Sequence, residues 1–216
     1  MYDGQSVVDF PAPQIPQYLQ ETALDTFHLP ALTPADFAET RRRGLIGMVD
    51  GQIITQDKGY AEGVDVSRDI LKMAVIERHK NTGHMGIGYL TGYGLKAGAV
   101  ATSVSHDSHN IICVGTNDKD MAFASNRIAQ NHGGIVVVKD GQILAELPLE
   151  IAGIMSSQSL ADVNVQLEQA KKAAYELGVN PNIDPFMTLS FMALPVIPTL
   201  RLTTRGVVDV LTQQYV

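Results

Sequence analysis

Residues 69–78 read DILKMAVIER, and this segment decides how the chain is expected to fold. Apolar residues run from Ile70 to Ile76, with Lys72 as the single interruption. A short run of large aliphatic and β-branched side chains is typical of a strand that is buried in a core. We therefore predict a well-buried strand over residues 69–78.

Further strands are expected on both sides of this segment. Two hairpins are predicted, at Asp50-Gly51 and at Asp140-Gly141, because an Asp-Gly pair between two apolar runs favours a tight turn. The strands that flank these pairs and the other strand candidates cover residues 45–49, 52–55, 85–93, 97–105, 135–138, 142–147 and 207–210.

Two segments have the apolar spacing of helices. The first covers residues 117–131 and has Thr116 or Asn117 as its N-cap. The second covers residues 159–177 and has Ser159 as its N-cap. One face of the second helix carries the apolar residues Leu160, Val163, Leu167, Ala170, Ala174 and Leu177. This order of elements indicates an α+β (mixed α/β) fold, with a mostly antiparallel or mixed sheet and helices packed on one side of it.

The first 40 residues differ in composition from the rest of the chain. They contain five of the ten prolines and six acidic residues but no Lys or Arg, so they account for −6 of the net charge of −7. Because proline interrupts helices and central strands, we predict a proline-rich acidic linker over residues 1–40 and a main domain over residues 41–216. Within the linker, Thr33-Pro34 is expected to start a short helix.

Charge, hydropathy and cysteine content restrict the class of protein. The net charge of −7 argues against binding to nucleic acid through the phosphate backbone. No apolar run approaches the roughly 20 residues that span a membrane, and the first residues lack the basic and apolar regions of a signal peptide. Cys113 is the single cysteine, which excludes a disulfide framework and fits a cytoplasmic protein.

Residues 103–116, SVSHDSHNIICVGT, carry the densest group of chemically useful side chains. They precede an apolar strand, and strand ends are where a fold presents such groups to a pocket. The catalytic candidates are His106, Asp107 and His109, with Ser105 and Asn110 as substrate-binding candidates. The metal signal is weak, because zinc needs three or four protein ligands and no His-x-His, HExxH or cysteine pair is present. The alternative is a turn in which these side chains satisfy backbone groups.

A second polar group, ERHKNTGH over residues 77–84, follows the predicted buried strand. It is expected to add Glu77, Arg78 and His79 to the substrate-binding candidates, with Arg78 as a clamp for an anion or a carboxylate. An exposed charged turn closed by Gly83 is an equally good interpretation. A further alternative is an independent metal or small-molecule site built from His79, His84, His106 and His109.

The motifs of the chain resemble the C-terminal domain of bacterial adenine deaminases. The resemblance is carried by IERHKNTG (76–83), SVSHDSHNI (103–111) and FMTLSFMALPVIP (186–198), and it extends from about residue 32 to residue 210. Adenine deaminases belong to the amidohydrolase superfamily and convert adenine and water into hypoxanthine and ammonia in purine salvage. The resemblance implies a preceding catalytic barrel with a divalent metal (Mn, Fe or Zn), whose His-x-His ligand set this chain lacks.

The resemblance also implies what the chain does. It is expected to line or cover the active site of the barrel, to hold no cofactor itself and to be inactive alone. His106, Asp107 and His109 would support the substrate or water. The expected partners are adenine and the barrel, which is missing or separately encoded, and a homo-oligomer is expected. The alternatives are a non-catalytic docking or oligomerisation domain and the independent histidine site.

The start of the chain has a feature that bears on this interpretation. Asp3-Gly4 has the pattern of a hairpin turn whose first strand is missing, so the chain begins inside a larger unit or has a frayed start. The resemblance implies the first, with residues 1–10 as the remnant of a β-subdomain that precedes the linker.

Overall fold

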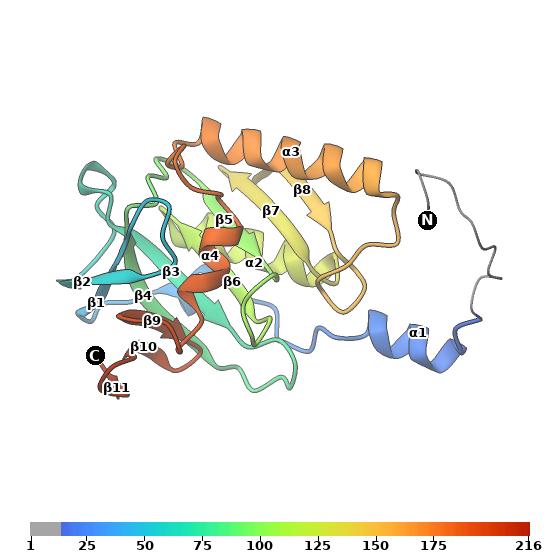
Figure 1. Ribbon diagram of the computed structural model, residues 1–216, viewed down its shortest axis with the longest axis horizontal. Coiled ribbons are helices and arrows are strands. Elements are labelled where there is room, and N and C mark those ends of the chain that lie inside the picture. Colours follow the sequence, from blue (N-terminus) through green and yellow to red (C-terminus); the bar gives the residue numbers. More distant parts are fainter. Residues whose placement is uncertain (1–13) are drawn as a thin grey trace, which may run out of the picture.

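The computed structural model describes residues 14–216, and its centre is a sheet of eight strands in the order β2-β1-β4-β3-β6-β5-β7-β8 (Figure 1). Neighbouring strands are antiparallel except β1 and β4, which are parallel. The strands are β1 (Arg43–Met48), β2 (Thr55–Ala61), β3 (Leu71–Ile76), β4 (Met85–Thr91), β5 (Ala99–Thr102), β6 (Ile111–Gly115), β7 (Gly134–Lys139) and β8 (Gln142–Pro148). The sheet is therefore mixed, as predicted.

Strand β3 coincides with the segment from which the fold was predicted. Every residue of Leu71–Ile76 is buried, and the strand pairs with β4 on one side and β6 on the other. Met73 and Val75 pack into one hydrophobic cluster, whereas Ala74 and Ile76 pack into another. Because both faces of this strand are covered by other elements, its sequence is apolar throughout instead of alternating.

Helices cover both faces of the sheet, so the expectation that they pack on one side was wrong (Figure 1). Helix α2 (Asp118–Gln130) packs on the face that contains Ala74. Helix α3 (Leu160–Glu176), helix α4 (Met187–Met192) and a small sheet pack on the face that contains Met73. The small sheet consists of β9 (Leu200–Thr203), β10 (Gly206–Asp209) and β11 (Gln214–Tyr215).

The predicted turns and caps are largely confirmed. Asp140 and Gly141 connect β7 and β8 with φ values of 53° and 72°, the conformation that a two-residue hairpin requires. The first hairpin also forms, but β2 begins at Thr55 rather than at residue 52, because residues 49–54 make a longer connection. The side chains of Asn117 and Ser159 cap α2 and α3 by accepting main-chain N–H groups.

Two helices had no counterpart in the prediction, α4 and α1 (Gln17–Leu24). Helix α1 lies in the proline-rich linker, begins after Pro16, and buries none of its residues. A 3₁₀ turn over Pro34–Phe37 confirms the expected short helix. The predicted turn at Asp3-Gly4 lies outside the described residues. In residues 14–216 no helix has the length and apolar character needed to cross a membrane.

Candidate functional site

The histidine loop, residues 103–110, connects β5 to β6 and is anchored at its base by Ser103. The buried Ser103 hydroxyl donates to the carbonyl of Gly153 at 2.6 Å and accepts the N–H of Gly134 at 2.7 Å. Gly153 has a φ of 77°, and a Cβ there would lie 2.8 Å from the Arg78 guanidinium and 2.9 Å from the Phe27 ring. The segment after β8 therefore packs closely against the base of the histidine loop. At Gly153 this close packing and the positive φ require glycine.

Antiparallel pairing brings the two predicted polar clusters together. Ile76 at the end of β3 pairs with Ile111 at the start of β6, so residues 77–84 lie beside the histidine loop. The His79 Nε2 atom is 2.7 Å from the carbonyl oxygen of Ser108, which joins the two loops directly. His84, by contrast, is the last residue of the loop of residues 77–84, and it is exposed.

The two imidazoles of the histidine loop have different surroundings. The ring of His106 lies 4.7 Å from the ring of Phe191, next to α4, and the main-chain N–H of His106 donates to Ser190. His109 is half-buried, and burial together with the Arg78 charge lowers its pKa below the ordinary value of 6.5. His109 is therefore neutral at neutral pH and can accept as well as donate a proton. Asp107 is exposed at the tip of the loop.

Three buried polar atoms of the histidine loop have no hydrogen-bond partner within the described residues. They are the Ser105 hydroxyl, Nδ1 of His109 and the Asn110 side-chain oxygen. A buried polar group without a partner costs roughly 1–3 kcal/mol, so proteins rarely gather several of them. The loop therefore retains hydrogen-bonding capacity for a ligand or for water.

Arg78 is buried and ties three segments together through main-chain carbonyls. Its Nε donates to His109 at 2.6 Å, Nη1 to Thr26 at 2.7 Å and Nη2 to Ala152 at 3.0 Å. The guanidinium also lies 4.2 Å from the centre of the Phe27 ring, and burial lowers its pKa to about 10. We expected an anion clamp; the observed partners instead make Arg78 hold the histidine loop against the linker.

Glu77 organises the loop that it begins. Its carboxylate accepts the N–H groups of His79, Lys80 and Thr82 and the hydroxyl of Thr82. Burial acts to raise the pKa of Glu77, but these hydrogen bonds outweigh it and lower the pKa to about 2. The carboxylate is therefore ionised at neutral pH and fixes the backbone on which His79 lies.

The described part of the chain does not form a metal-ligand set. Within residues 14–216, no three His, Cys, Asp or Glu side chains converge so that they could hold a metal ion. The four histidines considered for an independent metal site, His79, His84, His106 and His109, therefore lack that support. Cys113 is fully buried, and burial raises its pKa to about 12, so the thiol has no thiolate character at neutral pH.

Several residues that build this site were not among the predicted site residues. Ser103, Thr26 and Phe27 hold the histidine loop and Arg78, yet they come from segments far apart in the chain. No local pattern distinguishes an anchoring serine or threonine from an ordinary one, because its partners are set by tertiary packing.

The fold and the site define an α+β domain that presents a polar loop at the ends of its central strands. A family model for the adenine deaminase C-terminal domain matches residues 50–214. The chain therefore belongs to the adenine deaminase family, which confirms the resemblance seen in its motifs.

Curated relatives agree with the family model. An adenine deaminase of Brucella abortus (strain 2308) is 46% identical over 200 residues, covering 88% of this chain and 34% of the relative. An adenine deaminase of Geobacillus kaustophilus is 41% identical over 218 residues, covering 96% and 37%. "Adenine deaminase 2" of Carboxydothermus hydrogenoformans is 41% identical over 223 residues, covering 97% and 39%. The chain thus spans little more than a third of the length of these relatives.

Proposed function

We propose that this chain is the C-terminal part of an adenine deaminase and that its histidine loop lines or covers the active site. The reaction is the hydrolysis of adenine to hypoxanthine and ammonia, in purine salvage in the cytoplasm. The observation that carries the proposal is the set of three buried, unpartnered polar atoms in the histidine loop of a chain that belongs to this family. Such atoms are stabilised when a polar ligand pairs with them.

Each residue of the site has a role in this proposal. The neutral His109, with His106 and the exposed Asp107, orders the substrate or a water molecule and exchanges protons with it. Ser105 and Asn110 supply hydrogen bonds that orient the purine.

The second cluster contributes to the same site from behind the histidine loop. Arg78, Glu77 and His79 keep the loop in place through their main-chain contacts. They therefore act on substrate binding by positioning the groups that touch it.

The partner in this proposal is an amidohydrolase barrel outside the chain. The family resemblance implies a divalent metal, Mn, Fe or Zn, that activates water there. Because the described residues form no ligand set, they do not fit such a metal, and we assign it to the barrel. The chain alone is then inactive, and a homo-oligomer of the joined protein is part of the proposal.

An assay of ammonia release from adenine tests the proposal. The chain alone, with Mn²⁺, Fe²⁺ or Zn²⁺ added, is expected to show no turnover. The same chain joined to the preceding region of the Geobacillus kaustophilus relative is expected to be active. Turnover by the chain alone would show that it contains its own catalytic centre.

Variants of the histidine loop test the role of the site. In the joined protein, His109→Ala is expected to lower kcat by about tenfold to hundredfold. His84→Ala is the matched control, because His84 is exposed on the adjacent loop and should leave kcat unchanged. If His109→Ala kept full activity with the fold intact, the alternative of a non-catalytic docking domain would be favoured.

A further inference from the structure

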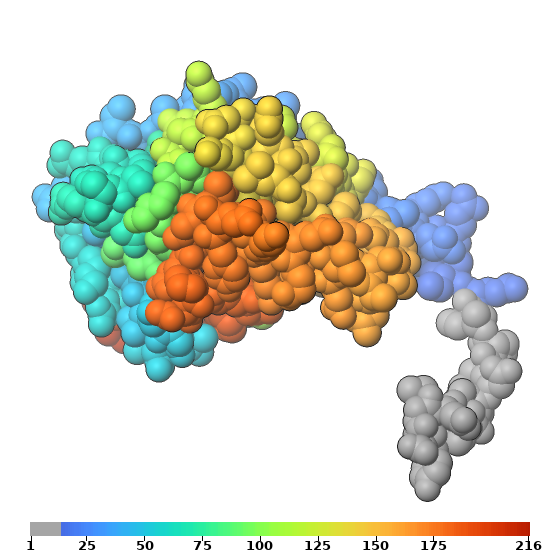
Figure 2. Space-filling view, turned by 90° about the horizontal axis from the view of Figure 1, so that it is seen from above, coloured from blue at the N-terminus to red at the C-terminus, as the bar shows by residue number. Residues whose placement is uncertain are grey.

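Helix α1 stands out from the body of the protein at one end, beside the segment that follows β8 (Figures 1 and 2). Large apolar side chains are exposed on α1, just before it and on the segment after β8, and we call them the α1 surface: Ile15, Tyr18, Leu19, Leu24 and Met155. A soluble protein rarely leaves a group of large apolar side chains exposed on neighbouring segments unless another body covers them.

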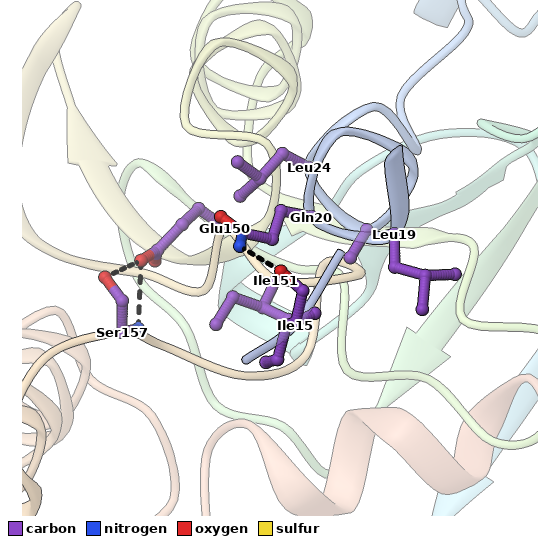
Figure 3. Close-up of a pocket in the computed structure, with 8 residues that line it drawn as sticks. Ile15, Leu19, Gln20, Leu24, Glu150, Ile151 and Ser157 are labelled. Atoms are coloured by element: carbon purple, nitrogen blue, oxygen red, sulfur yellow. Dashed lines mark hydrogen bonds between the residues drawn. The ribbon is translucent and has the colours of Figure 1, made fainter. Parts of the chain in front are cut away.

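A hollow of about 560 Å³ lies within the α1 surface, between α1 and the segment that follows β8 (Figure 3). Its walls include Ile15, Leu19, Leu24 and Ile151. Two polar side chains of its lining already have partners, since Glu150 accepts from Ser157 and the Gln20 side-chain N–H donates to the carbonyl of Ile15. The rest of the lining consists of apolar side chains.

Helix α3 also leaves a large apolar side chain exposed, in its first turn. Its predicted apolar face is buried at Ala170 and Ala174, but Leu160 on that face is 76% exposed. The first turn of the helix therefore extends its apolar face beyond the part that packs on the core. An apolar face that continues beyond its packing partner indicates a second partner.

We propose that the α1 surface is the docking site of the polypeptide that precedes this domain in full-length adenine deaminases. The family model describes a C-terminal domain, and the relatives are almost three times as long as their match to this chain. The match to the Geobacillus kaustophilus relative covers 96% of this chain, so its additional polypeptide reaches the domain close to α1. The inference rests on the proposed function for the identity of the partner.

The α1 surface is connected to the histidine loop by a short chain of contacts. The main-chain N–H of Ala152 donates to Ala23 of α1 at 2.7 Å, and its carbonyl accepts from Arg78. Arg78 in turn holds the carbonyl of His109. A body docked on the α1 surface would therefore lie beside the histidine loop, where the proposed function needs the rest of the active site.

Charge makes the proposed partner more specific. Helix α1 and the residue that follows it carry Glu21 and Asp25 but no Lys or Arg. We therefore expect the facing surface to be apolar at its centre and to carry Lys or Arg at its rim.

Hydrogen–deuterium exchange tests the docking site. The chain alone is compared with the same chain joined to the preceding region of the Geobacillus kaustophilus relative. The amides of residues 17–24 and 152–160 are expected to exchange at least about tenfold more slowly in the joined protein. Unchanged exchange in these residues would overturn the proposal.

Matched variants make the test specific for the surface. Tyr18→Asp and Leu19→Asp replace side chains that are 65% and 45% exposed, so the domain itself should still fold, and each should abolish the protection. Leu211→Asp is the control, because Leu211 is 70% exposed near β11 and should leave the protection intact. Equal loss in all three variants would contradict the assigned surface. If the joined protein does not fold, hydrogen–deuterium exchange is measured instead on the full-length Geobacillus kaustophilus relative. The residues that align with 17–24 and 152–160 are then compared with those of the chain alone.

The other occupants of the surface give different results. Protection of the chain alone that grows with protein concentration would assign the surface to a second copy. Protection that is lost when residues 1–13 are removed would assign it to that segment, and either result would overturn the proposal. Ammonia release is measured in parallel: protection without turnover contradicts the proposed function alone, and turnover without protection contradicts the docking site alone.

Discussion

Two arginines of this domain, Arg78 and Arg201, are buried to nearly the same extent, at 1% and 0% exposed. Within the described residues neither forms an ion pair, and burial lowers the pKa of each to about 10. Arg201 donates to the carbonyls of Ile53 and Pro198, as Arg78 donates to carbonyls of three other segments. Both guanidinium groups thus hold loops together through main-chain oxygens.

Each arginine is accompanied by a buried hydroxyl that bridges backbone segments. Ser103 joins the histidine loop to Gly153, while Thr55 donates to the carbonyl of Leu200 and accepts the N–H of Thr199. In both places the hydroxyl satisfies a main-chain donor and a main-chain acceptor, so the local chemistry of the two regions is almost the same.

The regions differ in what lies next to the arginine. Near Arg201, the buried atom without a partner in residues 14–216 is Nε of Arg201 itself. The hydrogen bond from Arg201 to Ile53 joins the small sheet to the connection between β1 and β2. Beside Arg78 lies the histidine loop, with its three unpartnered atoms and the pKa shift of His109. A buried arginine with a bridging hydroxyl therefore stabilises the fold around Arg201. Around Arg78 the same arrangement also holds a loop whose polar groups can still bind a ligand.

The largest expected effect comes from removing each guanidinium. Arg78→Met and Arg201→Met should each lower the free energy of unfolding by about 3 kcal/mol, because buried carbonyls lose a charged donor. Urea denaturation measures this change. Amide exchange in residues 103–110 should increase only for Arg78→Met, and an equal increase in both variants would remove the distinction between the regions.

The bridging hydroxyls sharpen the same comparison. Ser103→Ala and Thr55→Val should each destabilise the protein by about 2 kcal/mol, since each removes a buried hydroxyl that pairs with a main-chain N–H and a main-chain carbonyl. In NMR spectra, the imidazole signals of His109 should shift for Ser103→Ala and stay in place for Thr55→Val. A shift in both, or in neither, would show that Ser103 does not hold the histidine loop.

Glu77 gives a smaller effect with a defined pH dependence. Its pKa is about 2 in the folded protein and 4.5 ordinarily, so its contribution is present above pH 4.5 and is lost as the pH falls toward 2. Glu77→Gln should lower stability at pH 7 by about 1 kcal/mol, because solvent screens a partly exposed carboxylate. The variant should also lose stability less steeply between pH 4.5 and 2. Glu62→Gln, on an exposed loop, is the control and should retain the steep loss.

The smallest effect is expected from His109. Its pKa is lowered in the folded protein, so the unfolded chain binds more protons, and stability falls as the pH drops from 6.5 through the folded pKa. An NMR titration should place its midpoint below 6.5. Arg78→Met should raise that midpoint, since a nearby positive charge is removed, whereas Arg201→Met should not change it. A midpoint at or above 6.5 in the unmodified chain would contradict the assigned environment.

The outline of the fold could be predicted from local signals. The apolar run of β3, the Asp-Gly pairs and the caps Asn117 and Ser159 act on their own neighbours, so each was visible in a few residues. Which elements cover each face of the sheet was not visible, because a buried strand has the same composition whichever element packs on it. Helix α1 was not predicted, because the five prolines of residues 1–40 argue against a helix; Pro16 lies at its N-cap, however, and no proline falls inside it.

The candidate site divides in the same way. By itself the sequence determined that two polar clusters follow buried strands, that their residues include His106, His109 and Arg78, and that the chain resembles adenine deaminases. Only the tertiary structure decided that the clusters touch, that Arg78 holds backbone carbonyls, and that three polar atoms of the histidine loop are left without partners. The physical reason is that residue type sets what a group can donate or accept, whereas strand pairing and packing between distant segments decide which partner it meets.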